Sequence, residues 1–127
     1  MTMTVQQMMA QARDGLVELS PGQAQEHLDA DDAVFVDVRD GQEVAASGKV
    51  PGAIHASRGM LEFHLDPAMP MHDARLKSGK MVIFYCASGG RSALSAKTAR
   101  DMGYENVAHV AGGFGAWAGE GRPVERP

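Results

Sequence analysis

Short apolar runs alternate with amphipathic stretches along the whole chain. The two clearest runs, residues 33–38 and residues 81–85, are rich in β-branched and aromatic side chains and show little polar alternation. Such runs are typical of strands that are buried on both faces of a parallel sheet. A third run at residues 107–110 and a brief one at residues 53–56 complete the predicted strands.

Helix signals separate these runs. Ser20 followed by Pro21 is a typical helix start, with a hydroxyl N-cap and a proline at the first helical position, and it predicts a helix that ends near Ala30. The clearest helix, residues 92–102, carries a stripe of alanines and is followed by Gly103 as a stop signal. Shorter helices are predicted over residues 42–47, 60–65 and 114–118, and Thr4 is the predicted N-cap of a helical segment over residues 4–16.

Strands that alternate with helices, and that are apolar throughout, predict an α/β fold: a small parallel sheet flanked by helices on both faces. The 127 residues fit one domain, which we place at residues 18–127, preceded by an N-terminal helical arm at residues 1–17. The sequence leaves three roles open for the arm: a lid, a dimer contact or a packed element. In such folds, ligands bind at the carboxyl ends of the strands.

Composition and charge argue against several classes of function. The net charge is −4, whereas nucleic-acid-binding domains usually present a basic face, so we expect no nucleic-acid partner. No apolar run approaches the roughly 18 residues that span a bilayer, so we expect no membrane association. The single cysteine, Cys86, excludes an internal disulfide and a thiolate-rich zinc site. Residues 1–16 do not resemble a secretory signal, and we expect a cytoplasmic location.

The stretch Cys-Ala-Ser-Gly-Gly-Arg-Ser, from Cys86 to Ser92, joins a predicted buried strand to the clearest helix. Its glycines allow backbone conformations in which successive N–H groups point inward, and the helix N-terminus adds its positive end. Together these features make an anion cradle that favours the thiolate form of Cys86. Arg91 adds a permanent charge that faces either the anion or a structural carboxylate. A lone cysteine at a strand end is more often an inert packed residue, but this continuation favours an activated nucleophile.

The same stretch resembles the active-site loop of rhodanese-like sulfurtransferases. Three further segments resemble signatures of that family in the same order along the chain: residues 36–39, residues 48–54 and residues 103–117. Lys49 stands where the second signature commonly has a histidine. The resemblance extends over about residues 19–123, and it implies a compact α/β domain of the rhodanese type.

The resemblance also implies sulfur transfer through a persulfide on Cys86. The thiolate would take the outer sulfur of a small anion such as thiosulfate and pass it to a thiophilic acceptor: cyanide, a thiol or a protein thiolate. No metal or organic cofactor is implied, and the chain would act as a monomer or a homodimer. Substrate and persulfide would be bound by the other residues of the loop, which are Ala87, Ser88, Gly89, Gly90, Arg91 and Ser92.

Three alternatives stay open. The chain could be a persulfide carrier for a specific partner, or a regulatory interaction module with little turnover, although such modules typically lose the cysteine. Cysteine phosphatases of the dual-specificity cell-cycle type share the general fold, but their loops have one more residue between the cysteine and the arginine. Here four residues separate Cys86 from Arg91, so the cradle should be too tight for a phosphoryl group.

Charged residues elsewhere in the motifs are interpreted mostly as scaffold. Asp37 and Arg39 follow a buried strand, and we expect them to cap loops or to pair, either with each other or with Arg91. Arg58 follows a strand end, where it would either draw an anion or remain solvated on the surface.

The aromatic residues and histidines are likewise interpreted as structural. Phe114 and Trp117 are expected to pack in the core or at its rim. None of the histidines shows metal-ligand spacing, so we expect each to be structural or exposed, with rimming of the pocket as the alternative for His64 and His72. The five histidines are His27, His55, His64, His72 and His109.

Overall fold

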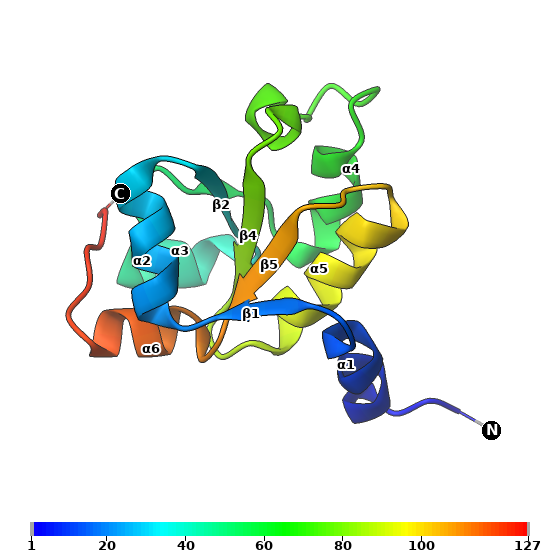
Figure 1. Cartoon of the computed structure of the whole chain (residues 1–127), viewed down its shortest axis with the longest axis horizontal. Helices are drawn as coiled ribbons and strands as arrows, with labels where there is room; N and C mark the ends of the chain where they lie inside the picture. Colours follow the sequence, from blue (N-terminus) through cyan, green and yellow to red (C-terminus); the bar gives the residue numbers. More distant parts are fainter. Residues whose placement is uncertain (1, 127) are drawn as a thin grey trace.

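Five short strands lie side by side in one parallel sheet, in the order β1-β5-β4-β2-β3 (Figure 1). The computed structural model describes residues 2–126. Helices cover both faces of the sheet, so the predicted α/β fold is confirmed. The strands are β1 (Val17–Leu19), β2 (Ala33–Asp37), β3 (Ile54–His55), β4 (Met81–Tyr85) and β5 (Val107–Val110).

Alternate side chains of the central strands pack into two separate cores, one on each face of the sheet. In β4, Val82 and Phe84 pack into one core, whereas Ile83 and Tyr85 pack into the other. The first core is covered by α4 (Leu61–Leu65) and α5 (Gly90–Asp101), and the second by α2 (Pro21–Ala30) and α6 (Gly113–Gly119) (Figure 1). The remaining helical segments are α1 (Val5–Arg13), α3 (Gly41–Ser47) and two 3₁₀ turns, Arg58–Met60 and Ala74–Lys77.

Capping residues start the first two helices where the sequence predicts. The hydroxyls of Thr4 and Ser20 each accept the backbone N–H of the glutamine three residues on, at 3.1 Å, and the glutamine side chains accept the caps' own N–H groups. α5 differs from the prediction: it begins at Gly90, two residues before the predicted start. Arg91 therefore belongs to the first helical turn, and the free loop after β4 is shorter than expected.

The N-terminal arm packs against the rest of the chain. α1 lies along α5, its Ala12 is buried, and the Arg100 guanidinium donates to the Ala12 carbonyl at 2.7 Å. The strand β1 that follows was not predicted, because three residues are too few to show a periodicity. Its pairing with β5 instead comes from the tertiary structure. Among residues 2–126, no helix is long and apolar enough to cross a membrane.

Candidate active site

Cys86 directly follows β4, a strand with neighbours on both sides, at the carboxyl end where ligands bind in parallel sheets. The residue is buried, with 1% of its surface exposed. Its Sγ accepts the backbone N–H of Gly89 at 3.0 Å and that of Ser92 at 3.4 Å. Two backbone amides are thus directed at the sulfur, where negative charge would meet hydrogen-bond donors.

The backbone of Gly89 explains how the loop turns its amide onto the sulfur. Gly89 has φ +129°, a conformation that residues with a side chain rarely adopt, and it is the N-cap of α5. The positive end of this helix therefore lies beside Cys86. Within residues 2–126, only the Gly89 and Ser92 amides are hydrogen-bonded to Sγ; the amides of the other predicted cradle residues are not, namely Ala87, Ser88, Gly90 and Arg91.

The first turn of α6 supports the cysteine loop. The N–H of Phe114 donates to the Cys86 carbonyl at 2.7 Å, and that of Gly115 donates to the Ala87 carbonyl at 3.0 Å. Gly113 has φ +61°, and a Cβ on it would collide with the Cys86 carbonyl. In the sequence, the glycine pair at the start of α6, Gly112 and Gly113, indicated only a turn. Its close approach to the cysteine is a feature of the tertiary structure.

Arg91 faces a structural carboxylate. Its guanidinium donates to both carboxylate oxygens of Glu43 in α3, at 2.7 and 3.0 Å. This pairing decides between the two orientations that the sequence left open. The hydrogen bonds from Arg91 also lower the pKa of Glu43 to about 2. Arg91 thus ties the first turn of α5 to α3.

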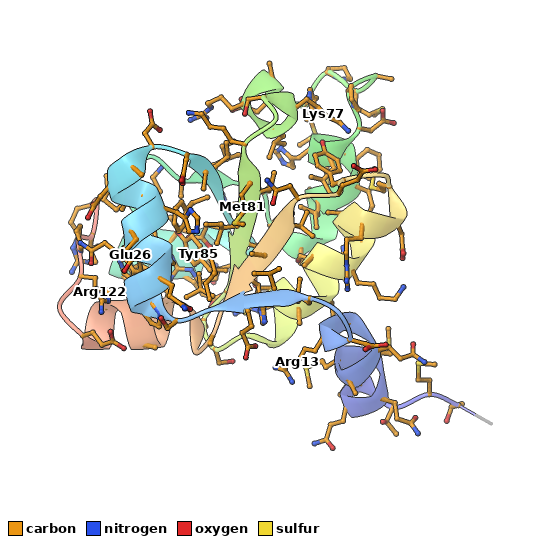
Figure 2. The ribbon with its side chains drawn as sticks, in the orientation of Figure 1. Arg13, Glu26, Lys77, Met81, Tyr85 and Arg122 are labelled. Atoms are coloured by element: carbon orange, nitrogen blue, oxygen red, sulfur yellow. The ribbon has the colours of Figure 1, made fainter. Side chains whose placement is uncertain are left out.

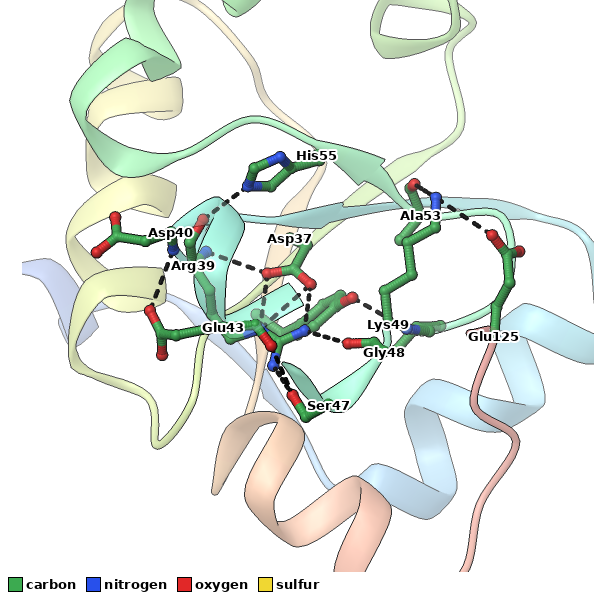
Figure 3. Close-up of polar contacts among 12 residues, drawn as sticks. Asp37, Arg39, Asp40, Glu43, Ser47, Gly48, Lys49, Ala53, His55 and Glu125 are labelled. Carbon is green, nitrogen blue, oxygen red and sulfur yellow. Dashed lines mark hydrogen bonds and ion pairs between the residues drawn. The ribbon is translucent and has the colours of Figure 1, made fainter. Parts of the chain in front are cut away.

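Asp37 and Arg39 form a buried ion pair, as the scaffold interpretation allowed (Figure 3). Arg39 Nη2 lies 2.7 Å from Asp37 Oδ2 and also donates to the Gly48 carbonyl at 2.6 Å, while Nη1 donates to Ser47 Oγ at 2.9 Å. The guanidinium carbon is 4.2 Å from the centre of the Phe114 ring. The pair therefore joins the end of β2 to α3 and to α6, which supports the cysteine loop.

The sequence profile of the rhodanese-like domain matches residues 20–120. The chain belongs to the rhodanese-like family. Over 104 residues, 82% of this chain and 89% of the relative, it is 32% identical to a sulfurtransferase of Allochromatium vinosum. It is 31% identical to the thiosulfate sulfurtransferase GlpE of Actinobacillus pleuropneumoniae over 108 residues, 85% of this chain and 92% of the relative. These relatives support sulfurtransferase activity in general for this rhodanese-like chain.

A solved structure from Rhodopseudomonas palustris resembles the rhodanese-like chain over nearly its full length. The TM-score is 0.92 and the sequence identity 43%, over 98% of this chain and 96% of the other. That protein is described as one of unknown function and a possible tyrosine phosphatase. The likeness therefore supports the fold of the rhodanese-like chain and leaves the choice of chemistry to the geometry of the loop.

Most other residues that the sequence singled out lie outside the cysteine loop of this rhodanese-like chain. Trp117 is buried, and its Nε1 donates to the Pro123 carbonyl at 2.7 Å. Arg58 bridges Glu62 and Thr98 and so joins α4 to α5. His72 Nδ1 is hydrogen-bonded to the carbonyl of His64, at 2.8 Å. Among residues 2–126, no group of three or more His, Cys, Asp or Glu could hold a metal ion.

Two functional candidates of the rhodanese-like chain were missed by sequence reasoning. His109 in β5 is 1% exposed, and its Nδ1 lies 3.0 Å from Ser92 Oγ. Arg13, the last residue of α1, lies on the same side of the molecule as the loop (Figure 2). Its Nη2 is 3.9 Å from where a Cβ on Gly89 would be, and within residues 2–126 its guanidinium has no ion pair or hydrogen bond. Both residues are distant from the loop in sequence, so no local motif includes them.

The Arg91–Glu43 pair predicts an acid-sensitive contribution to stability. Glu43→Gln should lower the free energy of unfolding by about 1 kcal/mol or less near neutral pH, because both side chains are about one-third exposed (36% and 34%). The pKa of Glu43 in the folded chain lies below its usual value of 4.5. The contribution is therefore present above about pH 4.5 and is lost as the pH falls toward 2.

Urea denaturation of the wild type and of Glu43→Gln, near neutral pH and again at a pH well below 4, measures this effect. The matched control is Glu62→Gln, which breaks an ion pair with Arg58 that lies away from the cysteine loop. We expect the difference between the wild type and Glu43→Gln to shrink in acid. A difference of the same size at both pH values would contradict the prediction.

Proposed function

We propose that this rhodanese-like chain is a sulfurtransferase that carries a sulfane sulfur as a persulfide on Cys86. One observation carries the proposal: the single cysteine lies at the carboxyl end of a central strand, with the amides of Gly89 and Ser92 directed at its Sγ. The donor that we propose is thiosulfate or another small sulfur-containing anion. The similarity to a thiosulfate sulfurtransferase supports this class of donor.

In the first half-reaction, the Cys86 thiolate attacks the outer sulfur of thiosulfate. A new sulfur–sulfur bond forms on Cys86, the sulfur–sulfur bond of thiosulfate breaks, and sulfite leaves with the bonding electron pair. The negative charge then lies on the outer sulfur of the persulfide. We propose that the amides of Gly89 and Ser92, which are directed at Sγ, stabilise it, since preorganised donors stabilise developing charge without reorganisation.

In the second half-reaction, a thiophilic acceptor removes the outer sulfur. Cyanide, a thiol or a protein thiolate attacks it, and Cys86 leaves as a thiolate, which closes a two-step covalent cycle. No external oxidant or reductant enters either step, so the cycle needs no cofactor. An open hollow of about 470 Å³ lies against Ala87, between α3 and α6, and offers an acceptor a route to the loop. A reducing cytoplasm is the setting that we propose, since oxidised Cys86 could not carry sulfur.

Positive charge near the loop favours an anionic donor. The charge of Arg91 is compensated by Glu43, so Arg91 supports the loop rather than meeting the donor with an unpaired guanidinium. Arg13 has no such partner within residues 2–126 and lies beside Gly89, the residue whose amide donates to Sγ. We therefore assign the attraction of the anion to the helix N-terminus and to Arg13.

The loop geometry supports sulfur transfer over phosphate hydrolysis. Four residues separate Cys86 from Arg91, and α5 begins within that stretch, at Gly90. The Arg91 guanidinium is paired with Glu43 through two hydrogen bonds, so it is not free to bind a phosphoryl group on Sγ. A cradle of this size fits one sulfur atom on Cys86.

The intact mass of the protein tests the proposal. Wild type and Cys86→Ser are incubated with thiosulfate and desalted, and their intact masses are measured. The masses are measured again after treatment with cyanide. We expect the wild type alone to gain one sulfur atom and to lose it to cyanide. If thiosulfate gives no gain, the experiment is repeated with inorganic polysulfide as donor. Absence of a sulfur adduct with both donors, or an adduct on Cys86→Ser, would refute the Cys86 persulfide.

A further inference from the structure

A chain of polar contacts leads from Cys86 into the sheet. Cys86 Sγ lies 3.6 Å from Ser92 Oγ, at the start of α5. Ser92 Oγ lies 3.0 Å from His109 Nδ1 in β5, and His109 Nε2 lies 2.8 Å from Glu18 Oε2 in β1. Cys86, Ser92 and His109 are each at most 1% exposed, whereas the Glu18 side chain is 50% exposed. Three elements, α5, β5 and β1, and the loop after β4 thus contribute one residue each to a single line of contacts.

The contact with Glu18 determines which nitrogen of His109 carries the proton. An ionised carboxylate can only accept, so His109 Nε2 must donate to Glu18. Burial lowers the pKa of His109, the hydrogen bond with Glu18 opposes this, and the charge of Arg13 on α1 lowers it further. In the neutral imidazole whose Nε2 donates to Glu18, Nδ1 is an acceptor directed at Ser92.

Ser92 completes the chain in either of two arrangements. In the first, the Cys86 thiol donates to Ser92 Oγ, and the Ser92 hydroxyl donates to His109 Nδ1. In the second, Nδ1 carries a proton and donates to Ser92 Oγ, whose hydroxyl is then free to donate to the Gly89 carbonyl, 3.1 Å away, or to the sulfur. The Gly89 carbonyl also accepts the Ala93 N–H at 3.1 Å, so it keeps a partner in both arrangements.

We propose that His109, oriented by Glu18, is a positioning residue that acts through Ser92 to hold Cys86 as a thiolate. The thiol proton passes to Ser92 Oγ as the S–H bond breaks, and the hydroxyl proton of Ser92 passes to His109 Nδ1. The products are a thiolate, an intact serine and an imidazolium paired with the Glu18 carboxylate. The inference rests on the proposed function only in that sulfur transfer uses this thiolate.

In this arrangement, His109 stabilises a negative charge on Cys86 throughout the sulfur-transfer cycle. Cys86 is anionic both as the free thiolate and as the persulfide, so the imidazolium can retain its proton in both states. The charged or titratable groups that face His109 are Glu18 from β1, Cys86 after β4 and Arg13 from α1, and of these only Glu18 and the thiolate favour the imidazolium. Removal of either His109 or the Glu18 charge should therefore disfavour the thiolate.

The pH dependence of Cys86 alkylation by iodoacetamide tests the proposal without any sulfur donor, because Cys86 is the only cysteine. The variant His109→Asn keeps a hydrogen-bonding side chain that cannot take up a proton. We expect it to move the midpoint of the alkylation profile upward by about one pH unit, which is about tenfold less thiolate below the midpoint. The rate at high pH, where every cysteine is a thiolate, should be unchanged.

Two further variants separate this role from simple packing. Glu18→Gln keeps the shape of a half-exposed side chain, so it should fold normally and shift the midpoint in the same direction by a smaller amount. His55→Asn removes a histidine of the same sheet whose Nε2 is 2.8 Å from the Arg39 carbonyl, and it should leave the midpoint in place. A histidine that only packs would change the stability in urea and leave all three midpoints equal.

An unshifted midpoint in folded His109→Asn would overturn the inference. If His109→Asn does not fold, Glu18→Gln decides: an unshifted midpoint there overturns the inference equally. A shifted midpoint in a protein that forms no persulfide with thiosulfate or polysulfide would support the role of His109 and refute the proposed sulfur transfer. The two proposals can therefore fail separately.

Discussion

Asp37→Asn is expected to lower the free energy of unfolding by about 3 to 5 kcal/mol, because it leaves the charge of Arg39 buried without a counter-charge. The Asp37 side chain is 0% exposed and that of Arg39 is 3% exposed, so water cannot replace the lost partner. Asparagine has nearly the shape of aspartate, and the effect therefore reports the charge rather than a cavity. Urea denaturation followed by circular dichroism measures it.

The chain contains its own control for this prediction. Asp73 and Arg75 repeat the same Asp-x-Arg geometry, with Nε of the arginine 3.1 Å from Oδ1 and Nη2 2.6 Å from Oδ2. Here, however, the side chains are 30% and 59% exposed. Asp73→Asn should therefore cost less than about 1 kcal/mol. Equal decreases in the free energy of unfolding for Asp37→Asn and Asp73→Asn would show that burial does not determine how much the Asp37–Arg39 pair contributes to stability.

Gly113→Ala is expected to damage both the stability of the fold and the backbone of the cysteine loop. The added Cβ would collide with the Cys86 carbonyl and would lie 2.7 Å from the carbonyl carbon and oxygen of Ala87. Alanine would also be strained at φ +61°. Overpacking and strain together should cost about 2 to 5 kcal/mol, and displacement of the loop backbone should abolish persulfide formation. Urea denaturation and the intact-mass experiment with thiosulfate measure the two effects.

Gly119→Ala is the matched control for this substitution. Gly119 closes the same helix, α6, and a Cβ on it would meet no atom within 4 Å. The change should leave persulfide formation intact and alter stability by no more than about 1 kcal/mol, in the stabilising direction expected of alanine in a helix. Normal persulfide formation by a folded Gly113→Ala protein would show that the cysteine loop does not depend on the close approach of the first turn of α6.

Local patterns in the sequence were sufficient to predict most elements and the position of Cys86 at the end of a buried strand. β4 and β5 have the predicted bounds, because continuous apolar runs with turn signals on both sides define buried strands. The hydroxyl caps of α1 and α2 were predicted for the same reason: a cap and the helix it starts are neighbours in sequence. β1 was not predicted, because three residues carry no periodicity and its partner, β5, is far along the chain.

The sequence by itself therefore determined the α/β class, the position of Cys86 at a strand end and the amide-rich turn that follows it. Only the tertiary structure decided which charges meet the loop. Arg91 is neutralised by Glu43, Arg13 reaches the loop from α1, and His109 is joined to Cys86 through Ser92. The physical reason is range: propensities and caps act between neighbours in sequence, whereas ion pairs and buried hydrogen bonds join residues that only the packing of strands and helices brings together.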